Sequence, residues 1–194
     1  MSGKLNCKHK NSFMSKQKLL LLSVLSLFFM GIIACSRTKS EEPEKLIEKI
    51  YAAPNPFRNE SLDSTLFSGR LYQLITAAKE TEKRSRESIR KSKTPTDKPI
   101  LIEGEIFASL YEGYTGWKIV SKKQTADTVW VTVEFTHKDY QQTWQDQVVC
   151  IREKEKWKLE NVLYGKATHL ATLQQVLTEC IETGKLEQIN LINN

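Results

Sequence analysis

Three stretches of the chain repeat apolar residues with the spacing of an amphipathic helix. The predicted helices span residues 41–53, 62–90 and 168–183. Ser40 can cap the first helix and Asp63 or Ser61 the second, because these side chains accept hydrogen bonds from free backbone N–H groups. The first two helices precede all predicted strands and the third follows them.

Between these helices the apolar period changes from helical to two, which is typical of half-buried strands. Four strands are predicted, over residues 115–121, 127–136, 143–152 and 156–163. The connections between them are short and polar, which favours an antiparallel meander. The sequence therefore predicts an α+β domain with helices packed on one face of a strongly curved antiparallel sheet.

The N-terminal stretch has a different pattern, with a 16-residue apolar run at 19–34 that follows several lysines. A membrane-spanning helix needs about 20 such residues, so the run is typical of a signal peptide. Met14 begins a normal signal peptide by itself and is a candidate for the true start. We expect a signal peptide at 1–34, a polar tether at 35–43 and one α+β domain at 44–194.

The end of this run, Ile32-Ile33-Ala34-Cys35, resembles the lipobox of bacterial lipoproteins. The resemblance implies cleavage before Cys35 and acylation of that residue, with the membrane as a partner through the lipid. Ser36 at the second mature position implies the outer membrane, facing the periplasm. The alternative is a short membrane anchor in which the cysteine is incidental.

The net charge of +6 arises mainly in this leader, which holds five lysines and no acid. The rest of the chain is nearly neutral, so the high isoelectric point does not indicate nucleic acid as a partner. Residues 79–93 still hold seven basic and three acidic residues. No aromatic residue is interleaved for base stacking. This stretch is either a solvated helix end or a docking site for an acidic surface or phosphates.

Two motifs, Asp97–Tyr114 (DKPILIEGEIFASLYEGY) and Trp157–Tyr164 (WKLENVLY), resemble a family of uncharacterised bacterial lipoproteins. That family has a nuclear-transport-factor-two-like (cystatin-like) domain. The resemblance implies a bent sheet that wraps helices into a cone, and it implies no established activity. Glu160-Asn161 departs from the pair of acids usual in the second motif, so a paired-carboxylate site there is not expected.

Enzymes of this fold superfamily, such as isomerases and dehydratases, use acidic groups inside the cone. A general base needs a cavity that shifts its pKa towards neutrality. The candidate acids are Glu134 and Asp146 in mid-strand, and Glu103 and Glu112 beside glycines in the first motif. The alternatives are a solvent-facing Glu134, and backbone hydrogen bonds from tight turns to Glu103 or Glu112. We expect a non-catalytic domain, with a cone enzyme as the alternative.

No metal-ligand spacing, nucleotide loop or cofactor fingerprint occurs in the sequence, so neither metal nor cofactor is expected. Cys150 and Cys180 remain after loss of the leader and acylation of Cys35. In an oxidising envelope they could form a disulfide that joins the last helix to the sheet. The alternative is two buried free thiols.

Aromatic residues gather in the β half, and tyrosine and tryptophan favour binding surfaces. Trp130 and Trp144 are expected to form an exposed patch, and Tyr114 is a further candidate for binding. The combined interpretation is a lipid-anchored envelope protein that binds a small ligand or a protein. By analogy, an envelope accessory or a toxin-immunity protein fits such a chain.

Overall fold

The computed structural model describes residues 42–52, 55–58, 62–92, 97–165 and 170–192, with side chains up to residue 186. All of them belong to one compact unit, Ser40–Asn194. The predicted signal peptide, Cys35 and the Ser40 cap lie outside the described residues. Within the described residues, no helix is both long enough and apolar enough to cross a bilayer.

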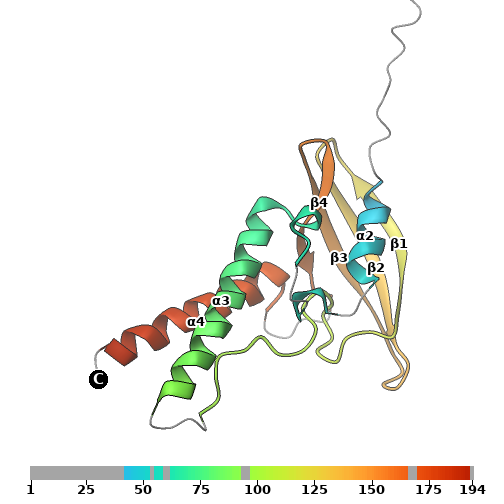
Figure 1. Ribbon diagram of the computed structural model, residues 1–194. Helices are drawn as coiled ribbons and strands as arrows, with labels where there is room; N and C mark the ends of the chain where they lie inside the picture. Colours follow the sequence, from blue (N-terminus) through green and yellow to red (C-terminus); the bar gives the residue numbers. More distant parts are fainter. Residues whose placement is uncertain (1–41, 53–54, 59–61, 93–96, 166–169, 193–194) are drawn as a thin grey trace, which may run out of the picture. The chain divides into compact units, whose positions relative to one another are not determined.

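The described residues form three α-helices and one four-stranded antiparallel sheet, which confirms the predicted α+β class (Figure 1). The helices are α2 (Pro43–Tyr51), α3 (Gly69–Lys91) and α4 (Leu173–Ile192). The strands are β1 (Gly116–Gln124), β2 (Thr128–His137), β3 (Gln142–Glu153) and β4 (Lys156–Leu163). Two short 3-10 helices, η1 (Pro56–Arg58) and η2 (Ser64–Leu66), lie between α2 and α3.

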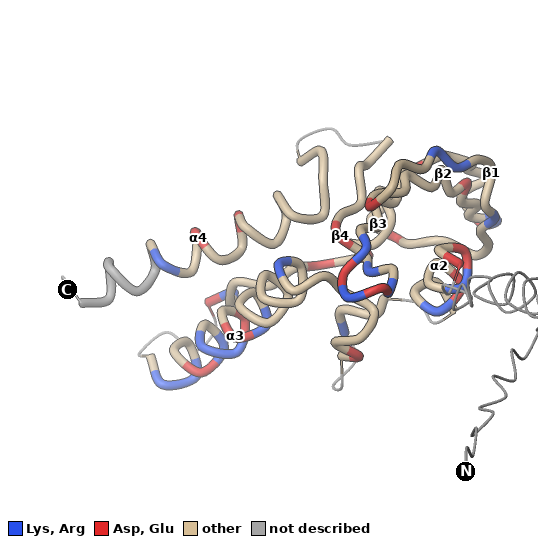
Figure 2. Tube along the Cα trace, turned by 90° about the horizontal axis from the view of Figure 1, so that it is seen from above, with Lys and Arg blue, Asp and Glu red and all other residues tan. Residues whose placement is uncertain are grey.

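The sheet order is β1-β2-β3-β4, so the predicted meander is confirmed. Buried and less buried residues alternate along β2, because successive side chains of a strand point to opposite faces of the sheet. The inner face carries the fully buried residues of β2, which are Val129, Val131, Val133 and Phe135. From above, α2 lies against one face of the sheet, and no described helix covers the other (Figure 2).

The second predicted helix begins in the wrong place, because the chain changes direction before α3. Asp63 caps η2 by accepting a hydrogen bond from Thr65 N at 2.8 Å. Phe67 then forms a parallel bridge with Leu159 of β4. Ser68 is the true cap of α3, since its Oγ accepts from Leu71 N at 3.0 Å. The contact with β4 interrupts what the apolar spacing predicts as one continuous helix.

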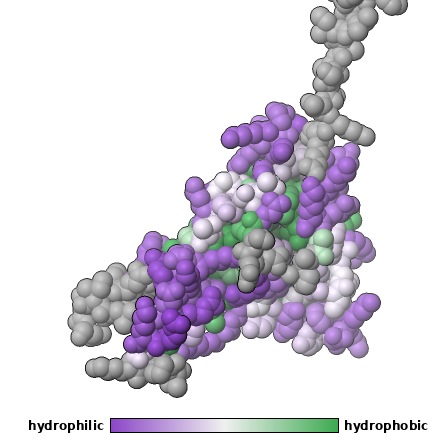
Figure 3. Space-filling model, viewed as in Figure 1, coloured by the Kyte–Doolittle hydropathy of each residue, from purple (hydrophilic) through white to green (hydrophobic). Residues whose placement is uncertain are grey.

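The core lies between the inner face of the sheet and the segments that cover it. Helix α2 buries Leu46, Ile47 and Ile50, and α3 buries Leu71 and Ile75. Helices α3 and α4 contact each other and run side by side beyond the sheet (Figure 1). Hydrophilic residues cover the visible side of α3 (Figure 3). A polar outer side and an apolar inner side are what an amphipathic helix at a surface requires.

Candidate functional site

The first family-like motif forms a long irregular segment between α3 and β1. Its central part, residues 104–113, is closed by a hydrogen bond from Glu105 N to Tyr111 O at 2.9 Å. Gly104 has φ +74°, and a Cβ there would come within 2.6 Å of Tyr111. Only glycine fits this position without strain. We call residues 104–113 the plug loop.

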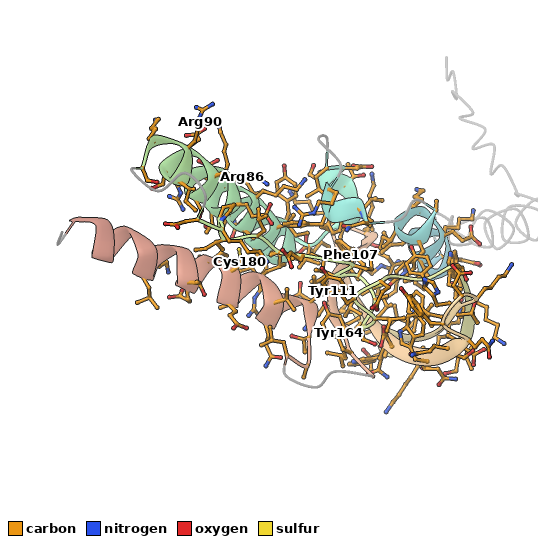
Figure 4. All side chains as sticks on the ribbon, turned by 90° about the horizontal axis from the view of Figure 1, so that it is seen from below. Arg86, Arg90, Phe107, Tyr111, Tyr164 and Cys180 are labelled. Carbon is orange, nitrogen blue, oxygen red and sulfur yellow. The ribbon has the colours of Figure 1, made fainter. Side chains whose placement is uncertain are left out.

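The plug loop fills the space over the inner face of the sheet. Ile106, Phe107 and Ala108 are each at most 3% exposed. The Phe107 ring lies 5.9 Å from that of Phe67. Tyr51 Oη donates to Phe107 O at 2.8 Å, and Tyr164 Oη donates to Ile106 O. Phe107, Tyr111 and Tyr164 gather between the helix pair and the sheet (Figure 4).

Asp146, in the middle of β3, fastens the plug loop to the sheet. It is 2% exposed and points to the inner face. Its Oδ2 accepts from Ser109 N at 2.7 Å and Trp144 Nε1 at 3.2 Å. Its Oδ1 accepts from Ser109 Oγ at 2.6 Å and Gly165 N at 2.8 Å. Both carboxylate oxygens are therefore occupied by protein donors.

Glu105, which no sequence pattern singled out, fastens the start of the plug loop. Its Oε1 accepts from Ile106 N at 3.0 Å and Phe107 N at 2.8 Å. Its Oε2 accepts from Asn55 N at 2.9 Å. Burial raises the pKa of Glu105, and the three N–H donors partly oppose that rise. The only signal in the sequence is one acid directly after Gly104, before an apolar run.

Glu82 of α3, also missed by sequence reasoning, binds the segment that leads to the plug loop. It is 2% exposed. Its Oε1 accepts from Ile102 N at 2.6 Å, and its Oε2 lies 2.9 Å from Arg58 Nη1 and 3.5 Å from Arg86 Nη2. Glu82 and Arg86 are four residues apart, which is the spacing of an ordinary ion pair on a helix surface. The sequence therefore gives no sign that Glu82 also contacts Arg58 and Ile102.

These three acids share one chemical property that limits what they can do. Each already accepts hydrogen bonds from backbone N–H groups of residues 102–109. A general base needs a lone pair aimed at a substrate proton. These carboxylates instead accept hydrogen bonds from backbone N–H groups of a segment without helix or strand. Such N–H groups would be costly to bury without a hydrogen-bond partner.

The four acids predicted from the sequence do not come together. Glu103 is exposed and forms an ion pair with Lys98 at 2.8 Å, and Glu112 is also exposed. Glu134 points away from the inner face, where it pairs with Lys118 at 2.7 Å and accepts from Gln145 Nε2 at 3.1 Å. Asp146 alone lies in the interior. Glu105, on the other side of Gly104 from Glu103, is the acid that accepts the backbone N–H groups of Ile106 and Phe107.

The prediction of an exposed tryptophan patch is wrong for Trp144. This residue is 5% exposed, because the register pairs it with Phe135 on the inner face, where the rings stack at 5.5 Å. Trp130 lies on the opposite, uncovered face and is half-buried. Tyr114 is also half-buried and packs edge-on against Tyr51, with ring centroids 5.7 Å apart.

Cys150 and Cys180 are both buried free thiols, in contrast to the predicted disulfide. Cys150 is a fully buried residue of β3, and Cys180 is a buried residue of α4. Burial raises the pKa of Cys150 to about 12 and that of Cys180 to about 11, so neither is an activated nucleophile.

Two cavities of the described region are lined by residues outside the plug loop. A groove of about 420 Å³ runs between Pro99–Glu103 and α4, with Val176, Cys180 and Thr183 in its wall. A smaller hollow of about 150 Å³ lies between α2, η2 and β4. The described residues contain no group of three or more His, Cys, Asp or Glu able to hold a metal ion.

The chain was also compared with known proteins. Comparisons with models of protein families, with curated proteins and with solved structures found no match. The interpretation of the site therefore depends on its geometry.

Proposed function

We propose that this chain is a lipid-anchored protein of the bacterial cell envelope whose folded domain binds rather than catalyses. Cys35 carries the lipid in this proposal, and the outer membrane, on its periplasmic side, is the site of action. The partner is a small ligand or a protein, and no nucleic acid or cofactor takes part. An envelope accessory or a toxin-immunity protein would have these properties.

One observation carries the non-catalytic part of the proposal, namely that the plug loop fills the interior of the domain. A cone enzyme would need an open polar cavity in this place. Here Phe107 is fully buried, and the carboxylates of Glu105 and Asp146 accept hydrogen bonds from the loop backbone. Recognition is then left to outer surfaces, such as the uncovered sheet face with Trp130.

The finer description of the fold belongs to the same proposal. We infer a curved, cone-like sheet of the nuclear-transport-factor-two-like (cystatin-like) type. Two register shifts support it, one at Val120 of β1, between Ile119 and Ser121, and one at Glu160 of β4, opposite Val149 and Cys150. Bulges of this kind bend a strand and increase its twist.

The substitution Asp146→Asn tests whether Asp146 has a structural rather than a catalytic role. The free energy of unfolding of the purified variant is measured in urea. An amide cannot accept all four hydrogen bonds, so we expect a loss of about 2–3 kcal/mol in the free energy of unfolding. The matched control is Glu134→Gln on the uncovered face of the same sheet. We expect this control to change the free energy by less than about 0.5 kcal/mol.

An acid/base enzyme of the isomerase or dehydratase kind is the second candidate. The raised pKa of the half-buried Glu105 favours it, because catalytic acids are often tuned in this way. Buried catalytic acids commonly cost stability, so their neutral variants are as stable as the wild type or more so. An Asp146→Asn variant of unchanged or increased stability would support the enzyme and contradict the proposed structural acid.

A further inference from the structure

Four basic residues of α3 lie in a row, or stripe, along one side of the helix. Lys79, Lys83, Arg86 and Arg90 follow one another at intervals of four, three and four residues. In a helix this spacing brings them onto one side. Figure 2 shows Lys and Arg positions in blue along α3. Arg58 of η1 lies beside the stripe, since its guanidinium and the Lys79 ammonium both contact the Phe57 ring, at 5.1 and 5.5 Å.

Other residues of α3 face elsewhere. Thr81, about half a turn away, packs against Gly184 of α4. Glu80 and Glu87 lie about a quarter turn from the stripe, on an adjacent side. Arg86 and Arg90 project from the side of α3 turned away from α4 (Figure 4). The stripe is therefore on a side of α3 that the α4 contact does not cover.

The buried Glu82 organises two members of the stripe. It pairs with Arg58 at 2.9 Å and with Arg86 at 3.5 Å. The side chains of these arginines remain 40% and 51% exposed. Glu82 thus forms ion pairs with two of the five cations. Burial, and to a smaller extent repulsion from Arg58, lowers the pKa of Lys79.

We propose that this stripe, Arg58, Lys79, Lys83, Arg86 and Arg90, docks the domain on an anionic phospholipid surface. The inference rests on the proposed lipid anchor and deepens it, since it assigns the face that meets the membrane. Basic side chains near an anionic bilayer are attracted to it electrostatically. The tether from Cys35 to Glu42 spans at most about 25 Å, which keeps the domain close to the bilayer.

The composition of the stripe favours lipid headgroups over nucleic acid. No aromatic side chain projects among its cations to stack on bases, and Phe57 is 2% exposed. The cations are spread along more than three helical turns, which suits a flat charged surface better than one small anion. An electrostatic contact of this kind weakens as salt increases.

The experiment uses the acylated full protein, purified from membranes and reconstituted into phosphatidylcholine vesicles with or without phosphatidylglycerol. A fluorophore at Ser92→Cys, at the end of α3, reports energy transfer to a labelled lipid. Cys150 and Cys180 are buried with raised pKa values, so they compete poorly for the dye. We expect transfer to increase about twofold with phosphatidylglycerol, and to return to the lower value in about 0.5 M salt.

The decisive variant reverses two stripe charges, Lys83→Glu with Arg90→Glu, and we expect it to abolish the increase. The matched control reverses two charges on another side of α3, Arg84→Glu with Lys91→Glu, and should retain most of it. Equal transfer in both vesicle types would overturn the inference alone, as would equal loss in both variants. An unmodified Cys35 in the purified protein would overturn the anchor as well. Loss of the increase upon addition of soluble RNA, at concentrations that leave the vesicles intact, would indicate a nucleic acid partner instead.

Discussion

At the scale of single residues, the acids of this domain act on the backbone. Glu82, Glu105 and Asp146 accept N–H groups from residues 102–109, a segment without helix or strand. The sequence singles out Asp146 by strand alternation, but it favours Glu103 and Glu112 over Glu105. Which acid turns inward depends on the path of the plug loop, and that path depends on contacts with residues about 40 to 60 positions away in the chain.

Glu105 should give stability a characteristic pH dependence. Burial raises its pKa in the folded state above the ordinary value of 4.5. The folded state then binds this proton more tightly, so the contribution of Glu105 is fully present below pH 4.5 and is lost as the pH rises through the folded pKa. We expect the free energy of unfolding of the wild type, minus that of Glu105→Gln, to decrease as the pH rises from about 4 to 7.

Glu103→Gln provides a control of opposite sign for this measurement. The ion pair with Lys98 holds the pKa of Glu103 below its ordinary value, so its contribution is present at neutral pH and lost on acidification. The difference between wild type and Glu103→Gln should therefore be small and increase with pH. A Glu105 difference that also increases with pH would contradict the desolvated carboxyl described above.

At the scale of elements, the strands could be predicted and the loops could not. Alternation of the kind seen from Val129 to Phe135 locates a strand because it depends only on neighbouring residues. The predicted bounds of β4 agree with the structure, and the other strands differ by a few residues. The start of α3 was misplaced because the Phe67–Leu159 bridge is a tertiary contact. The apolar residues of the plug loop follow neither a helical nor a strand period, so the sequence could predict only an irregular segment there.

The start of α3 offers a direct test of this corrected boundary. We expect Ser68→Ala to cost about 1 kcal/mol of unfolding free energy, because its hydroxyl caps Leu71 N in a buried place. The control is Ser92→Ala at the other, exposed end of the helix, which should cost less than about 0.5 kcal/mol. Urea unfolding measures both variants. Equal effects at the two ends would mean that Ser68 is not the cap.

At the scale of the whole molecule, the basic residues form two groups, one in the leader and one in the folded domain. The leader lysines account for most of the net charge of +6 and belong to export in our proposal. The basic stripe, by contrast, belongs to the folded domain. In our proposal the lipid tether holds this domain at the membrane, so the anchor determines which surfaces the domain meets.

Acylation of Cys35 is thus the claim on which the account most depends. The most direct measurement is the intact mass of the protein purified from the membrane fraction, with Cys35→Ser as the test variant and Cys7→Ser as its matched control. We expect a wild-type chain that begins at Cys35 and carries acyl chains, an uncleaved and unacylated Cys35→Ser variant, and a Cys7→Ser variant with the wild-type mature mass. A wild-type chain with an unmodified Cys35 would contradict the account.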